Sequence, residues 1–167
     1  WLAFTWGVGS LFGTYIGGVL TTRYAARKEA LQMRATALIF VVGGLFNAMV
    51  YLLSDQYVAL VLLALVAILF SMVNGAIFSA IQSLVNERMR SVALAVIFLL
   101  ANLIGFGLGP LAVGALSDVL APIFGQASLR YALAVFSPGF LWVAFYYWRA
   151  SKTIEADIRA VELQRDL

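Results

Sequence analysis

The sequence predicts an all-α, polytopic helical membrane protein, and its composition is the first reason. Of 167 residues, 63% are hydrophobic and only 11% are charged, whereas soluble domains are about 45–50% apolar and about 25% charged. A helix needs roughly 20 apolar residues to cross a hydrocarbon core of about 30 Å. Five uncharged stretches in succession meet that length, and none shows the strict alternation of a membrane β-strand.

These stretches divide the chain into a transmembrane part, residues 1–150, and a cytoplasmic amphipathic tail, residues 151–167. We expect spans at about 1–22, 35–54, 57–84, 91–118 and 130–149. In the tail, Ile154, Ile158 and Val161 recur on one helical face. We expect this tail to be a solvated helix that packs on the inner loops.

The first span is rich in glycine, with small residues four apart at Gly9, Gly13 and Gly17. This spacing is typical of helices that approach a neighbour closely. Only Ser54-Asp-Gln-Tyr57 separates the second span from the third, so these two spans should form an antiparallel hairpin.

The third and fourth spans each carry neutral polar and aromatic residues on one helical face. In the third span this face holds Ser71, Asn74, Gly75, Phe78 and Gln82; in the fourth it holds Phe98, Asn102, Gly105, Phe106 and Gly109. An amide in hydrocarbon must find a partner. Two interpretations stay open: Asn74 and Asn102 hydrogen-bond between helices, or both line a substrate cavity walled by the phenylalanines.

The fourth span contains the run Gly105-Phe-Gly-Leu-Gly-Pro110. Gly105, Gly107 and Gly109 allow close approach, and Pro110 removes a backbone donor and bends the helix. We expect a break here that faces protein or a water-filled cavity. The alternative is a packing helix with an incidental kink. The following connection, 118–130, is expected to lie on the membrane surface, with Ser128 as the N-cap of the last helix.

Charge predicts the orientation. All but one of the 11 basic residues follow the first, third and fifth spans, and Arg130 is the exception. The positive-inside rule then places the C-terminus in the cytoplasm and the N-terminal residue outside.

Residue types argue against an enzyme. The chain has no histidine and no cysteine, and no serine, histidine and aspartate set or metal-ligand cluster is present, so we expect no metal and no cofactor. The basic residues cluster at the ends of apolar runs, which fits membrane topology rather than nucleic-acid binding. No span has an internal charged residue, so any proton coupling would use residues outside this chain.

The segment Gly18-Val-Leu-Thr-Thr-Arg23-Tyr-Ala-Ala-Arg27-Lys28 resembles the loop signature of the major facilitator superfamily. Gly18, Leu20, Arg23 and Arg27 match it, and Lys28 holds its final basic position. Thr22, Ala25 and Ala26 depart from it, which resembles the weaker copy between helices eight and nine. The missing aspartate argues against a charge-relay role for this loop.

A second set of residues resembles the spinster-like branch of that superfamily, whose members transport sphingolipids and lysophospholipids. The set comprises Arg88-Met-Arg90-Ser-Val-Ala, Asn102–Pro110, Gly114-Ala-Leu-Ser-Asp118, and Gly125 with Leu129-Arg130-Tyr131-Ala132. The resemblance implies that the five spans are helices eight to twelve of a twelve-helix fold, that helices one to seven are absent from this sequence, and that helices eight, ten and eleven face the cavity.

These observations predict part of a secondary active transporter, a symporter or antiporter, that works by alternating access. The resemblance implies an amphipathic lipid-like substrate, the missing N-terminal half as partner, a monomeric full-length protein and the bacterial inner membrane. The predicted substrate-binding residues are Asn74, Phe78, Phe98, Asn102 and Phe106, the predicted hinge is Gly105, Gly107, Gly109 and Pro110, and Arg23, Arg27 and Lys28 would hold the inner loop.

Two alternatives remain. One is a transporter of the same superfamily for a hydrophilic organic anion or sugar. The other is a structural membrane subunit that transports nothing, in which the third and fourth spans pack tightly and leave no aqueous cavity.

Overall fold

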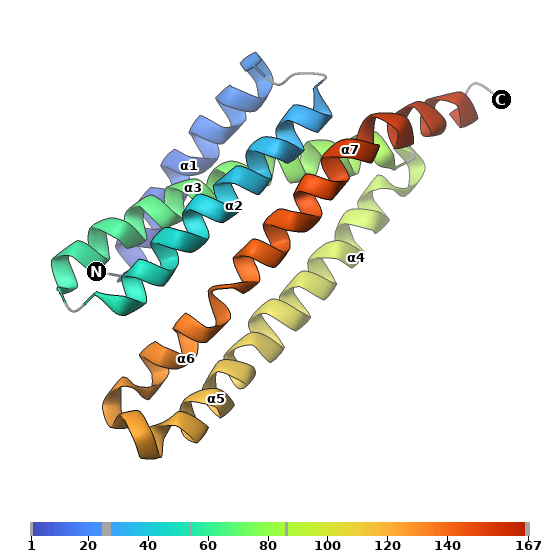
Figure 1. The fold of residues 1–167 in the computed structure, drawn as a ribbon. Coiled ribbons are helices and arrows are strands. Elements are labelled where there is room, and N and C mark those ends of the chain that lie inside the picture. The colour runs from blue at the N-terminus through green and yellow to red at the C-terminus, as the bar shows by residue number, and fades with distance from the viewer. Residues whose placement is uncertain (1, 25–27, 54, 86, 166–167) are drawn as a thin grey trace.

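The computed structural model describes residues 2–24, 28–53, 55–85 and 87–165, which are helical almost throughout and include no strand. Long helices run back and forth along one direction (Figure 1). The α-helices are α1 Leu2–Tyr24, α2 Glu29–Leu52, α3 Gln56–Leu84, α4 Arg90–Asn102, α5 Gly109–Phe124, α6 Ser128–Phe136 and α7 Gly139–Arg165. A π-helix, η2 Leu103–Leu108, joins α4 to α5, and 3-10 turns lie at η1 Glu87–Met89 and η3 Gly125–Ala127.

Three helical segments are long and apolar enough to cross a membrane, as an integral membrane protein requires: Glu29–Leu52, Gln56–Ile81 and Arg90–Ala160. The third segment contains a reversal, because the chain turns between α5 and α6 and runs back along α7 (Figure 1). α1 has the length of a span at 23 residues, but glycine, threonine, tryptophan and tyrosine dilute its apolar residues.

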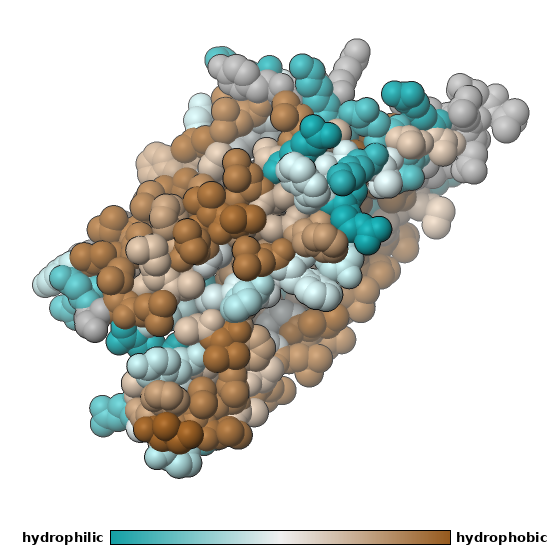
Figure 2. All heavy atoms as spheres, in the orientation of Figure 1, coloured by the Kyte–Doolittle hydropathy of each residue, from teal (hydrophilic) through white to brown (hydrophobic). Residues whose placement is uncertain are grey.

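The charged connections gather at the two ends of the helices. The end of α1, the start of α2, the α3–α4 junction and the end of α7 lie at one end, which we call the basic end (Figure 1). Apolar side chains cover most of the face between the two ends (Figure 2). The charge segregation seen in the sequence is therefore also a segregation in space.

The glycines of α1 pack directly on α3, as their spacing predicts. A methyl group on Gly13 would overlap the carbonyl oxygen of Ile68, and one on Gly17 would overlap that of Met72. A methyl group on Gly9 would lie 3.0 Å from the Cβ of Ala67. The prediction of close packing by the first span is confirmed.

α2 packs on α3 and α7 through an aromatic cluster that the sequence analysis missed. The ring of Phe70 from α3 lies 5.5 Å from Phe40 of α2 and 4.9 Å from Phe140 of α7, and Tyr147 stacks on Phe40 at 5.5 Å. Aromatic pairs prefer such centroid separations. Gly43 and Gly44 make room, because a Cβ at either position would collide with the side chain of Phe70 or Phe140.

The connection between α5 and α6 is largely helical, because α5 continues to Phe124 and only η3 separates it from α6. Its expected position on the membrane surface stays a prediction, and the expected N-cap is wrong. Gly125 reverses the chain with φ +54°, which glycine adopts without strain. Ser128 is not an N-cap: it is the first residue of α6, and its hydroxyl lies 3.0 Å from that of Ser117 on α5.

Arg130, the basic residue apart from the rest, lies at the end opposite the basic end. Its Nε donates a hydrogen bond to the backbone carbonyl of Tyr51 in the last turn of α2. The carbonyls of a last helical turn lack intrahelical donors and carry partial negative charge. Arg130 supplies a hydrogen-bond donor to one of them and a positive charge beside this end of α2.

The expected fifth span is interrupted and then extended. α6 ends at Phe136, Ser137 and Pro138 form a turn, and α7 then runs without a break into the tail as far as Arg165. Ile154 of the tail is 4% exposed and packs with Met33 and Ala80. The tail is thus the end of α7, fixed to α2 and α3 at the basic end; the side chain of Val161 lies outside the described residues.

Candidate functional site

The candidate site begins with an aromatic contact between α3 and α4. The rings of Phe78 and Phe98 lie 5.6 Å apart. The two helices are antiparallel neighbours joined at the basic end, so Asn74 and Asn102 each stand one turn beyond this contact, on the side away from the junction. We call Asn74, Phe78, Phe98 and Asn102 the amide face.

Beyond the aromatic contact α3 and α4 separate. α3 runs alongside α1 and α2, whereas α4 and α5 continue outward to the hairpin with α6 (Figure 1). Asn74 and Asn102 are both exposed, and Phe98 is 48% exposed. The structure therefore brings Phe78 and Phe98 into contact and leaves Asn74 and Asn102 exposed on the diverging parts of the two helices.

The hydrogen bonds of the two amides decide what they can do. Asn102 Nδ2 donates to the carbonyl oxygen of Phe98 at 2.7 Å, within its own helix, which leaves Oδ1 as an acceptor. Asn74 makes no side-chain hydrogen bond to the described residues. Neither amide links two helices within that part of the chain, so both can serve a ligand.

Phe106, the fifth predicted residue, stands apart. Its side chain is 82% exposed, and no ring of another described residue packs against it. It lies in η2, where i→i+5 bonding widens the turn and takes the following residues out of the 3.6-residue period. The prediction that Phe98, Asn102 and Phe106 share one face assumed a regular α-helix, which η2 interrupts directly after Asn102, so it stays a prediction.

The π-helix is the main surprise at the predicted hinge. α4, η2 and α5 form one continuous helical run rather than the expected break, and the Gly109 amide donates to the carbonyl oxygen of Ile104. A proline clashes with the carbonyl four residues earlier and has no amide to donate. A wider turn directly before Pro110 relieves both problems, and π-turns of this kind are frequent at functional sites.

The predicted hinge residues are open to their surroundings. A Cβ placed on Gly105 or Gly107 would meet no heavy atom within 4 Å, and one on Gly109 only the carbonyl oxygen of Ile104 at 3.9 Å. None of the described residues from Arg90 to Phe124 is buried. These glycines therefore do not serve packing within this chain.

The loop signature is described in part. Gly18 lies in α1, Arg23 occupies its last turn and is exposed, Lys28 precedes α2, and Arg27 lies outside the described residues. Thr22 stands where the superfamily has an aspartate, and its hydroxyl donates to the carbonyl oxygen of Gly18 at 2.9 Å. That hydroxyl is bonded within its own helix.

The amide face is distinct from the cavities that lie between the other helices. A cavity of about 270 Å³ lies between α1, α2 and α3, and one of about 370 Å³ lies between α2 and α7. Neither is lined by a residue of the amide face. Neither cavity was predicted from the sequence, although both have small residues such as Ala35, Ala76 and Ala144 in their lining.

Comparison with family models, with curated proteins and with solved structures finds no match to this chain.

Proposed function

We propose that the chain is part of a secondary active transporter of the major facilitator type that works by alternating access on an amphipathic, lipid-like substrate. The observation that carries the proposal is the amide face, where two hydrogen-bonding side chains flank an aromatic contact on two apolar, diverging helices. Transporter sites of this kind lie near the midplane, at irregular helices.

The amide face offers complementary chemistry to such a substrate. Asn74 can donate and accept, and Oδ1 of Asn102 can accept, so together they suit a hydroxyl or amide in the substrate's polar part. Phe78 and Phe98 offer apolar surface one turn away for the adjoining chain. A lysophospholipid or a sphingoid lipid joins these two chemistries in one molecule.

Movement would come from η2. Asn102 directly precedes the π-helix, so a change of π-turn to α-turn would rotate and shift one amide relative to the other. The open surroundings of Gly105 and Gly107 support this role, because no neighbouring side chain in the described part of the chain opposes the change.

The finer assignments belong to the same proposal. They are five spans corresponding to helices eight to twelve of a twelve-helix transporter, a cytoplasmic basic end and C-terminus, and residence in the bacterial inner membrane. The clustering of the basic connections at one end supports the orientation. The separation of α3 from α4 favours a transporter over a structural subunit, in which these helices would pack tightly.

Flux into proteoliposomes tests the proposal. The full-length protein is assayed with a labelled lysophospholipid and a labelled sphingoid phosphate, with and without a pH gradient. We expect saturable flux that falls about tenfold in Asn74→Leu and in Asn102→Leu, since each removes a hydrogen bond to the substrate. Gln126→Leu is the matched control, because it removes an exposed amide from η3, away from the amide face.

Normal flux in both asparagine variants would refute the assignment of the site. Flux of a labelled sugar or organic anion, with none of either lipid, would replace the lipid-like substrate with a hydrophilic one. Correct folding and orientation of the variants are checked first by thermal unfolding and by protease access to the tail.

A further inference from the structure

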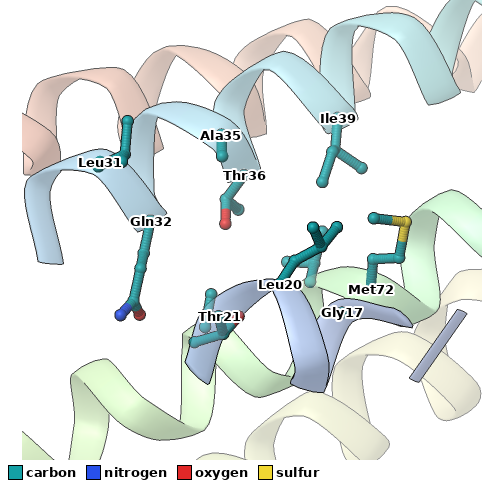
Figure 3. A pocket seen from close by; sticks show the side chains of 11 residues that line it. Gly17, Leu20, Thr21, Leu31, Gln32, Ala35, Thr36, Ile39 and Met72 are labelled. Atoms are coloured by element: carbon teal, nitrogen blue, oxygen red, sulfur yellow. The ribbon is translucent and has the colours of Figure 1, made fainter. Parts of the chain in front are cut away.

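A second candidate site lies between α1, α2 and α3, near the basic end. α1 and α2 both pack on α3, and a cavity of about 270 Å³ remains between them. Met72, Val73 and Ala76 of α3 are among the residues that line it, and Figure 3 shows Met72 beside Gly17 and Leu20. Nothing in the proposed transport function uses this cavity.

The cavity is polar at one end and apolar at the other. Thr21, Gln32 and Thr36 line the part nearer the basic end, and the side chains of Gln32 and Thr36 extend into the cavity (Figure 3). Ile39 and Met72 line the deeper part. From Gln32 to Ile39 the helix rises about 10 Å, so the gradient covers a sizeable part of one membrane leaflet.

The hydroxyls at the polar end find no hydrogen-bond partner among the described residues. Thr36 is 1% exposed, and neither its hydroxyl nor that of Thr21 makes a hydrogen bond to the described residues. A buried hydroxyl without a partner is costly, so an occupant that accepts hydrogen bonds at this depth would be favoured. The acceptors must also belong to a largely apolar molecule, because the rest of the lining is apolar.

The cavity opens sideways, toward the surroundings of the helices. Leu20 and Leu31 at its rim are 41% and 47% exposed. Lys28 flanks the polar end, four residues before Gln32 on the same side of α2, and Arg23 lies in the last turn of α1, near the same end of the helices. The Lys28 carbonyl accepts a hydrogen bond from the Gln32 amide at 3.1 Å, which ties the start of α2 to the cavity.

We propose that this cavity binds one anionic glycerophospholipid from the leaflet at the basic end. The acyl chain lies along Ile39 and Met72, and the ester carbonyls accept hydrogen bonds from the hydroxyls of Thr21 and Thr36. The phosphate is held at the level of Arg23 and Lys28, where charged side chains attract anionic lipids. The order of chain, ester and phosphate in such a lipid matches the order of apolar, polar and basic residues in the protein.

This site is independent of the amide face. Successive helical residues are about 100° apart, which places Met72, Val73 and Ala76 on the side of α3 opposite Asn74 and Phe78. A ligand at one place therefore does not touch the other. Loss of lipid binding would leave the proposed transport site in place, and loss of transport would leave the lipid site.

Native mass spectrometry of the detergent-purified protein tests the proposal. The protein is stripped of lipid and titrated with phosphatidylglycerol, with phosphatidylcholine of the same chains, and with glycerol phosphate as the headgroup alone. We expect one tightly retained phosphatidylglycerol, about tenfold weaker retention of phosphatidylcholine, and no retention of glycerol phosphate.

Two variants locate the site. Thr36→Val keeps the shape and removes one buried hydroxyl, and Ala35→Phe places a ring in the cavity; each should weaken phosphatidylglycerol binding about tenfold. The matched controls are Thr14→Val on α1 and Ala95→Phe on α4, both exposed and neither lining the cavity. Circular dichroism shows whether each variant is folded.

Unchanged phosphatidylglycerol affinity in a folded Thr36→Val protein and in a folded Ala35→Phe protein would overturn the proposal. Equal affinity for the two phospholipids would overturn the role of Arg23 and Lys28. Retention of glycerol phosphate alone would show that the site recognises a soluble anion instead of a lipid. A protein dimer that excludes lipid and depends on Ala35 would show that a second copy fills the cavity.

Discussion

Glycine has different roles in two glycine-rich helical regions of this chain, α1 and η2. In α1, a methyl group on Gly13 or Gly17 would overlap backbone atoms of α3. In η2, a methyl group on Gly105 or Gly107 would meet no heavy atom within 4 Å. Glycine in α1 brings two helices together, whereas the glycines of η2 lie where no described residue approaches them. The presence of glycine alone does not tell these roles apart; the spacing of the glycines and their neighbours do.

The largest expected effect is on the free energy of unfolding, which glycine-to-alanine substitutions at two positions of α1 should change in different directions. Gly13→Ala should lower the free energy of unfolding by about 1–3 kcal/mol, because the new methyl group must push α1 away from α3. Gly7→Ala, on the same helix with nothing near its Cβ, should be neutral or raise that free energy by up to about 1 kcal/mol. Thermal unfolding in detergent measures both. Equal destabilisation by the two variants would contradict the packing assigned to α1.

The helical run of α4, η2 and α5 contacts the rest of the described chain mainly where α5 meets α6. The second prediction concerns this contact between α5 and α6. Phe124 of α5 and Tyr131 of α6 have ring centroids 4.3 Å apart. A double-mutant cycle with Phe124→Ala and Tyr131→Ala should give a coupling energy of about 0.5–1.5 kcal/mol in unfolding. A coupling near zero would mean that the hairpin of α5 and α6 is held by its turn alone. The Phe145 and Tyr146 pair, neighbours on α7, is the control that joins no two helices.

The hydroxyl contact in the same hairpin should matter less. Ser117 and Ser128 lie 3.0 Å apart, and hydrogen bonds between membrane helices average about 0.6 kcal/mol. Ser117→Ala and Ser128→Ala should therefore be individually mild and coupled by about that amount in a double-mutant cycle. Coupling well above 1 kcal/mol would show that this contact, rather than the aromatic one, anchors α5.

Particular residues show how far the sequence alone predicts this structure. The spacing of Gly9, Gly13 and Gly17 was sufficient to predict close packing, because a helix face of small residues has few other uses. Ser128 was misassigned as an N-cap because the rule for caps assumes where the preceding helix ends. Here α5 continues until Gly125, whose positive φ reverses the chain only three residues before α6.

The candidate site was predicted residue by residue but not in its geometry. Antiparallel order brings Phe78 to Phe98, as expected for neighbouring faces. The bond from Asn102 to its own helix and the outward position of Phe106 were not foreseen, because both depend on local backbone geometry. A Gly-Pro run predicts only that a regular helix is disfavoured; it does not predict whether the chain kinks or widens into a π-turn.

The last prediction concerns Gly107→Ala in η2. It should change the free energy of unfolding very little and still slow the movement of the proposed hinge. Gly107→Ala adds a methyl group that meets no neighbour in the described part of the chain, so unfolding should change by less than about 1 kcal/mol. If η2 is the hinge, alanine's preference for the α-helix should favour one state and slow the proposed flux severalfold. Gly114→Ala, in regular α5 with equally open space, is the matched control and should leave flux unchanged. Because the chain has no cysteine, single cysteines at positions 74 and 102 report the same change as altered accessibility. Normal flux with normal accessibility in Gly107→Ala would show that the π-helix only accommodates Pro110.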